Sequence, residues 1–368
     1  MFDAIMLGKK QVIITVDKML KQKHFDEILK HTIKEEAVKT AVTIDLSGII
    51  WIELDAALWL ISLMNKLKIR GNDIKLVFPD PKTTTGRKIW DYLITWKFFE
   101  TLKRCVDSPV NLLEIEQLKY IDSLESQYKP TRQDRRKTLD DRGESHQLPQ
   151  SLLEIETIEY ENYLKGISKY TENFSGTAWA TIANFCGWSD ADTTEFINMV
   201  VTEGLINSFL HGDNTWTNVS MKSDDKNIIL VICDNGKGIP SSLRETFNKK
   251  KDLLNGKDYS NQNDAFLLEY FTKPEMVIDS LLINQATHKA QGAIGRNGNG
   301  LFYLKEFILK YNGKLRIRSG TAWVGFEKSN EIEVIEPIDL LIQSPGTLIT
   351  IILPKDEFHR GKKGAFGN

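Results

Sequence analysis

The first hundred residues alternate between short apolar stretches and longer segments with helical periodicity. Residues 41–47 and 73–79 are short apolar stretches, which predicts two buried strands. Residues 55–71 carry apolar positions at helical spacing and end at Gly71, and residues 86–105 predict a second helix. Strands that alternate with helices indicate a parallel or mixed sheet covered by helices, and therefore an α/β domain.

The second half of the chain contains a helical segment, residues 192–211, with one polar and one apolar stripe. Glu203, Asn207 and His211 recur every four residues and therefore share one face. The apolar stripe lies roughly opposite and comprises Ile197, Val201, Leu205 and Phe209. Ser189 and Asp192 have capping-box spacing, so we expect the helix to start there. The polar stripe is either a solvated face or a set of side chains that points into a cleft.

Residues 227–240 combine a buried strand with a glycine-rich turn. The apolar run from Ile228 to Cys233 predicts the strand, which delivers Asp234 to its end, before Gly236 and Gly238. An Asn-Gly pair is also a hairpin signal, but the segment that follows has a helical, polar pattern instead of a partner strand. The pattern favours a ligand site, because the acid can accept hydrogen bonds from an exocyclic amine and glycines allow close approach.

Residues 292–308 form a glycine-rich box that leads into a helix from Leu301 through Phe307. Free backbone amides and the positive end of the helix dipole together make such a segment an anion site. The Gly-x-x-Gly-x-Gly spacing is neither the dinucleotide fingerprint nor a phosphate-binding P-loop. A flexible loop would give the same pattern, so this box alone does not establish an anion site.

Taken together, these three boxes resemble the ATP-binding motifs of the GHKL superfamily, which includes gyrase, heat-shock-90 chaperones, histidine kinases and mismatch-repair ATPases. The Gly-Thr of "SPGTLITIILP", residues 344–354, resembles the late Gly-Thr of that superfamily. The pattern of the boxes most closely resembles that of anti-sigma-factor serine kinases. The resemblance implies a two-layer α/β sandwich of the Bergerat type over residues 152–356.

The resemblance also implies ATP and Mg²⁺ as cofactors and gives roles to the polar stripe. Asn207 would be the metal ligand, consistent with the preference of a hard cation for oxygen. Glu203 would be the catalytic general base that activates water or a substrate hydroxyl. His211 would support the triphosphate.

The other two boxes would hold the remainder of the nucleotide. By resemblance, Asp234 would bind the adenine amino group, with the Thr347 hydroxyl nearby. Arg296 would stabilise charge on the γ-phosphate, or is simply a solvated loop arginine. The glycines implied in binding are Gly236 and Gly238 beside the nucleotide, and Gly295, Gly298 and Gly300 around its phosphates.

The run "TIDLSGIIWIELDAALWLISLMNKLKIRGNDIKLVF" resembles the STAS family, the anti-sigma-factor-antagonist fold, over about residues 10–105. Members that switch by phosphorylation carry Asp-Ser-Ser-Gly at the start of the helix. Here the matching residues are Glu53 to Ala56, without a hydroxyl, which argues against such a switch. Asp55 either mimics the charge of a phosphorylated serine or simply complements the helix dipole.

Composition excludes several other classes. The 368 residues carry a formal charge of −2, with 41% hydrophobic and 27% charged residues, so no basic excess points to nucleic acid. The longest apolar run, residues 56–64, is too short to cross a bilayer, and the N-terminus lacks the pattern of a signal peptide. The three cysteines have no close spacing, which argues against a disulfide framework or a cysteine zinc site. We therefore expect a cytoplasmic protein.

The predicted organisation is a STAS-like domain over residues 1–106, a connecting segment over 107–151, an ATP-binding domain over 152–356 and a tail over 357–368. The connecting segment includes a charged linker, residues 127–151, whose basic cluster is balanced by acids. The long stretch at about 240–300 predicts an enlarged lid.

The expected function is that of a bacterial regulatory protein that hydrolyses ATP or transfers its γ-phosphate to a protein Ser/Thr. The alternative is a nucleotide-gated switch without significant turnover. Partners would bind through the STAS-like domain or the lid, and a homodimer is compatible with either function.

Overall fold

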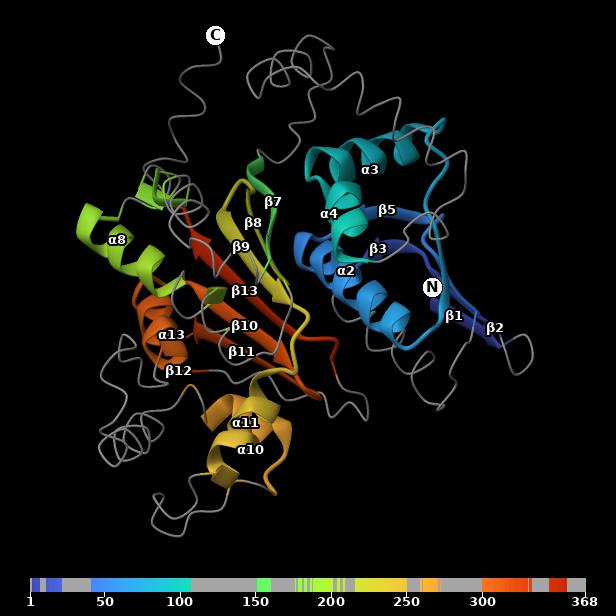
Figure 1. Ribbon diagram of the computed structural model, residues 1–368. Coiled ribbons are helices and arrows are strands. Elements are labelled where there is room, and N and C mark those ends of the chain that lie inside the picture. Colours follow the sequence, from blue (N-terminus) through green and yellow to red (C-terminus); the bar gives the residue numbers. More distant parts are fainter. Residues whose placement is uncertain are drawn as a thin grey trace, which may run out of the picture. The chain divides into compact units, whose positions relative to one another are not determined.

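The computed structural model describes two compact units, Met1–Ile155 and Glu156–Asn368, which are treated separately (Figure 1). The described residues are 2–6, 11–21, 41–106, 151–159, 176, 178–180, 182–183, 186, 188–200, 204–205, 208, 216–249, 259, 261–270, 272, 300–329, 331–332 and 344–355. The predicted linker up to residue 150 and the predicted tail lie outside them.

The first unit contains a mixed sheet in the order β1-β2-β4-β6. Its strands are β1 (Phe2–Met6), β2 (Gln11–Val16), β4 (Ala41–Asp45) and β6 (Asp73–Val77). β4 pairs in parallel with both β2 and β6, whereas β1 is antiparallel to β2. β3 (Lys18–Leu20) and β5 (Ile49–Ile52) form a small parallel sheet. The predicted strands and the mixed α/β class are confirmed for this unit.

Three helices accompany these sheets: α2 (Leu54–Ile69), α3 (Thr84–Thr95) and α4 (Phe98–Cys105). The single helix predicted over residues 86–105 is wrong, because the chain turns at Trp96 and Lys97, where Lys97 has a left-handed φ of 57°. The turn lets Phe99 of α4 stack on Trp90 of α3, with ring centroids 4.9 Å apart. Aromatic packing thus outweighs the continuous helical pattern.

Asp55 lies in the first turn of α2 and is buried. Its Oδ1 accepts a hydrogen bond from the backbone N of Ala56, 2.8 Å away. A carboxylate at this position complements the positive end of the helix dipole, as the simpler of the two interpretations of Asp55 expects.

A seven-stranded sheet in the order β12-β11-β10-β13-β9-β8-β7 contains the strands of the second unit, and its edge strand β7 begins before the unit boundary at Glu156. From β12 to β8, every neighbouring pair is antiparallel. The strands are β7 (Ser151–Glu159), β8 (Trp216–Ser223), β9 (Asn227–Asp234), β10 (Lys314–Ser319), β11 (Ala322–Ser329), β12 (Glu331–Ile332) and β13 (Thr347–Pro354). The late strand β13 therefore lies between β9 and β10, at the centre of the sheet.

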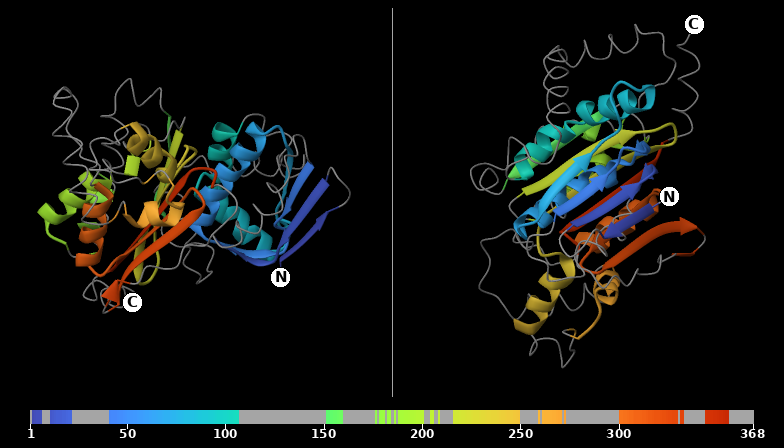
Figure 2. Two further views of the ribbon diagram at one scale, coloured as in Figure 1. Left: turned by 90° about the horizontal axis from the view of Figure 1, so that it is seen from below. Right: turned by 90° about the vertical axis from the view of Figure 1, so that its right-hand side faces the viewer.

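Helix α13 (Gly300–Lys310) packs against β10 and β11, and helix α8 (Asp190–Met199) lies beside α13 (Figures 1 and 2). Trp188 and Phe196 contact Phe307 of α13, with centroid distances of 5.5 and 5.9 Å. Ser189 caps α8, since its Oγ accepts from the backbone N of Asp192 at 3.1 Å. The predicted cap is confirmed. The rest of the helix predicted over 192–211 is described only at residues 204, 205 and 208 beyond α8 and Val200.

Two further helices, α10 (Ile239–Lys249) and α11 (Asp264–Tyr270), lie at one end of the sheet (Figure 1). α10 directly follows the Asp234-Asn-Gly turn, so the expectation of a helix instead of a hairpin partner is confirmed. No helix in the described ranges is long and apolar enough to span a membrane.

Candidate functional site

A row of buried polar side chains crosses four strands at one end of the seven-stranded sheet. Thr217 of β8 pairs with Asp234 of β9, and Ser319 of β10 pairs with Thr347 of β13. The register between β9 and β13 continues from the pair Cys233 and Leu348 to place Thr347 beside Asp234. Because paired residues of antiparallel strands point to the same face, these four side chains form one line, the polar row.

Asp234 is the charged member of the polar row. Its Oδ1 accepts hydrogen bonds from the backbone N of Gly236 at 2.8 Å and of Thr347 at 3.0 Å. Burial raises the pKa of Asp234 to about 6, and the two backbone hydrogen bonds oppose that rise. The site therefore holds an acceptor whose orientation is fixed by backbone from two segments that are far apart in sequence.

Glycines bring the backbone close to this carboxylate. A Cβ on Gly346 would lie 2.0 Å from the carbonyl oxygen of Asp234, so only glycine fits between the strand ends. Gly238 has a φ of 87°, and a Cβ there would lie 2.8 Å from the Oγ of Ser319. The backbone N–H of Gly236 donates to Asp234 in an Asx turn. The family resemblance predicted Gly236 beside the nucleotide and did not predict this contact.

Ser319 is a member of the site that the sequence analysis missed. Its Oγ is hydrogen-bonded to the Oγ1 of Thr347 at 2.9 Å and accepts from the backbone N of Ile239 at 2.8 Å. The serine thus links the predicted Thr347 hydroxyl to the first residue of α10. Only the strand register, which no local pattern reveals, places it beside Thr347.

The segment around Gly204 packs on the face of the sheet that carries the polar row. A Cβ on Gly204 would lie 2.4 Å from the Cδ1 of Ile232, two residues before Asp234. The Oγ of Ser208 lies 2.6 Å from the Oγ1 of Thr217, a member of the row. Leu205, which the apolar stripe predicts to be in the core, is buried.

The predicted catalytic and metal-binding side chains lie outside the described residues. They are Glu203, Asn207 and His211; Glu203 directly precedes Gly204, Asn207 directly precedes Ser208, and His211 follows Ser208 by three residues. Among the predicted phosphate-binding residues, Gly295, Arg296 and Gly298 also lie outside, whereas Gly300 is the first residue of α13. Within the residues that are described, no group of three or more His, Cys, Asp or Glu side chains could hold a metal ion.

Neither the models of known protein families nor the curated proteins give a match to this chain.

Proposed function

We propose that the second unit binds Mg·ATP as a Bergerat-type domain of the GHKL superfamily and either hydrolyses it or transfers its γ-phosphate to a protein Ser/Thr. One observation carries the proposal. It is the buried Asp234 carboxylate at the end of β9, held by backbone amides of Gly236 and Thr347.

A buried, ionised acceptor suits the adenine ring. The amino group of adenine donates hydrogen bonds, and a carboxylate is an acceptor only when it is ionised. With a pKa of about 6, Asp234 is mostly ionised at neutral pH. The glycine at position 346 and the left-handed Gly238 keep side chains away from the same strand ends, which supports close approach of a flat ligand.

The placement of α13 supports a phosphate site beyond the base. Its first residue, Gly300, ends the glycine-rich box, and the helix packs against α8 and against β10 and β11 of the sheet. The N-terminus of an eleven-residue helix favours negative charge through its free amides and its dipole. By resemblance, Gly295, Gly298 and Arg296 complete this end of the nucleotide.

The chemistry would then depend on the polar stripe. Asn207 would hold the magnesium ion, which neutralises charge on the phosphates. Glu203 would accept the proton of the attacking water or Ser/Thr hydroxyl as the new O–P bond forms, and ADP would leave with the electrons of the broken bond. The close packing of Gly204 on Ile232 supports a helix held firmly on the sheet at this point.

The first unit completes the proposal. Its mixed sheet and its helices are compatible with the STAS-like domain that the sequence resembles, and we assign it a protein partner in the cytoplasm. No hydroxyl stands at the position of the phosphoacceptor motif, so control would come from binding.

The test is Mg²⁺-dependent ATP binding and turnover by the full chain and three variants. We expect Asn207→Ala to lose binding, and Glu203→Ala to bind ATP without turning it over. Asp225→Asn, in the exposed turn before β9, serves as the control and should behave as the wild type. Binding without turnover in the wild type would favour the nucleotide-gated switch, and absence of binding would refute the site.

A further inference from the structure

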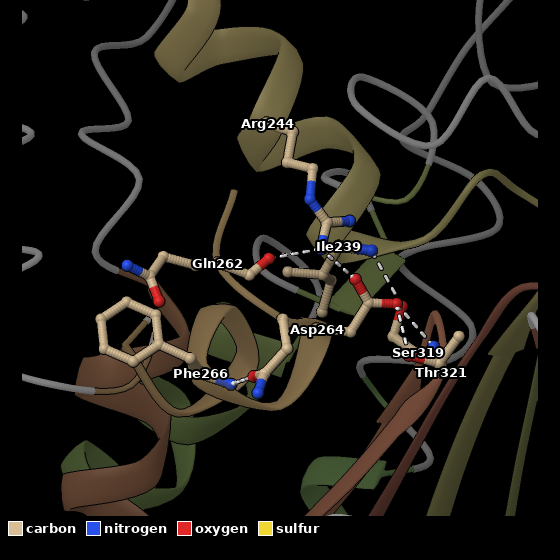
Figure 3. A network of polar contacts seen from close by, with 8 residues as sticks. Ile239, Arg244, Gln262, Asp264, Phe266, Ser319 and Thr321 are labelled. Atoms are coloured by element: carbon tan, nitrogen blue, oxygen red, sulfur yellow. Dashed lines mark hydrogen bonds and ion pairs between the residues drawn. The ribbon is translucent and has the colours of Figure 1, made fainter. Parts of the chain in front are cut away.

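A buried carboxylate outside the polar row connects α10, α11 and the β10–β11 turn (Figure 3). Asp264, the first residue of α11, accepts from the backbone N and the Oγ1 of Thr321 through its Oδ2, at 2.6 and 3.0 Å. Its Oδ1 is ion-paired with the guanidinium of Arg244 on α10 at 2.5 Å. With 8% of its surface exposed, Asp264 is almost fully desolvated. These contacts are strong because charge-assisted hydrogen bonds gain strength away from water.

The two helices that Asp264 joins form one packed piece. Leu243 of α10 and Leu267 of α11 share a small core that also includes Ile239, Tyr259 and Tyr270. Arg244 donates a second hydrogen bond, to the carbonyl oxygen of Gln262 at 2.7 Å (Figure 3). In its described part, the segment predicted as a lid therefore contains two helices that are packed on each other and attached to the sheet.

The attachment point is the turn from Ser319 to Thr321. Gly320, at its centre, has a φ of 62°, and a Cβ there would lie 2.2 Å from the Oδ2 of Asp264. Its backbone is thus shaped to receive the carboxylate. The same turn holds the start of α10, because Ser319 accepts from the backbone N of Ile239. Asp264 thus contacts both α10 and the turn, and the turn contacts α10 in its own right.

We propose that Asp264 is a positioning residue for the nucleotide-binding end of the sheet. It fixes the Ser319–Thr321 turn, and Ser319 in turn holds the Thr347 hydroxyl and the residue that follows Gly238. Asp264 reaches the Asp234 carboxylate through these intermediates, because the backbone N of Thr347 donates to Asp234. The inference rests on the proposed function, since it concerns the geometry of that same site.

The experiment measures adenosine binding by NMR titration and Mg·ATP binding by calorimetry, with the full chain. Asp264→Asn keeps the size of the side chain but removes the charge that Arg244 and Thr321 contact. We expect it to raise the Kd of adenosine and of ATP by the same factor, about tenfold, equivalent to about 1.4 kcal/mol. Asp225→Asn makes the same chemical change in an exposed turn of the same unit and should leave both Kd values unchanged.

A second pair of variants separates positioning from loss of folding. Thr321→Val removes the hydroxyl donor, whereas Thr321→Ser retains it, and both keep the backbone N–H that bonds Asp264. We expect weaker adenosine binding for Thr321→Val and recovery for Thr321→Ser. Hydrogen exchange should be faster in residues 235–242 of Asp264→Asn and Thr321→Val, with the exchange of central β9 and β13 unchanged.

The outcomes distinguish this inference from the function on which it rests. If the wild type binds ATP and Asp264→Asn binds both ligands equally well, the positioning role is wrong and the proposed function stands. A loss of ATP affinity without a matching loss for adenosine would also overturn it, because the effect would then lie at the phosphates. If the wild type binds neither ligand, both proposals fail.

Discussion

The replacement of Asp234 by asparagine gives a stability prediction that follows directly from its surroundings. The asparagine amide keeps an oxygen that can accept from the backbone N of both Gly236 and Thr347, while the buried charge disappears. Burial raises the pKa of Asp234 from 3.8 to about 6 in the folded protein. Ionisation of Asp234 is therefore harder in the folded than in the unfolded state.

The sign of the pH dependence follows from proton linkage. Between the two pKa values the folded state binds more protons, so the contribution of Asp234 to stability is present below pH 3.8 and is lost as the pH rises through about 6. A rise of this size corresponds to roughly 3 kcal/mol above pH 7, and about half of that stability is lost between pH 5 and 8. Asp234→Asn lacks this loss and should be the more stable protein at pH 8.

Native-state hydrogen exchange of β9 and β13, with urea, measures the free energy of opening of the second unit separately from the first. We expect the advantage of Asp234→Asn over the wild type to grow from pH 5 to pH 8. Because the two proteins share all other titrating groups, the contributions of those groups to the pH dependence cancel in the difference. An advantage that is independent of pH, or a wild type that is the more stable protein at pH 8, would refute the reasoning.

Two further substitutions test the geometry around the site. Gly346→Ala would place a Cβ 2.0 Å from the carbonyl oxygen of Asp234, and we expect a loss of about 1–3 kcal/mol in the opening free energy of β13. Unchanged exchange of β9 and β13 would show that the strands do not meet this closely. Ser189→Ala removes the cap of α8 and should cost about 1 kcal/mol, seen as faster exchange in the first turn of the helix. Ser189→Thr should restore most of the protection, and the cap would be unimportant if alanine exchanged no faster than threonine.

Local patterns predicted many of the elements. The apolar run before Asp234 predicted β9, and the polar helical pattern after the turn predicted α10. The glycine box predicted a helix from Leu301, and α13 begins one residue earlier, at Gly300. These predictions rest on periodicity and on glycine, which act over a few residues. The break between α3 and α4 at Lys97 could not be predicted, because it depends on how Phe99 packs on Trp90.

The contacts that define the site join residues that are far apart in the sequence, and local patterns do not reveal them. Asp234 meets Thr347 across 113 residues of sequence, and Ser319 joins them only through the register of β10 and β13. The resemblance to a family supplied Asp234 and Thr347, but Ser319 and Asp264 belong to no motif. Tertiary structure alone brings Asp264 to Thr321, 57 residues away.

The central claim is that the Asp234 end of the sheet binds adenine, and titration of the wild-type chain with Mg·ATP and Mg·GTP tests it most directly. Guanine presents a carbonyl oxygen where adenine presents an amino group, so an ionised Asp234 would face an acceptor instead of a donor. The account predicts that ATP binds about 10–100-fold more tightly than GTP, the loss expected when a buried charged group goes unpaired. Equal affinities for the two nucleotides, or no binding of ATP, would contradict it.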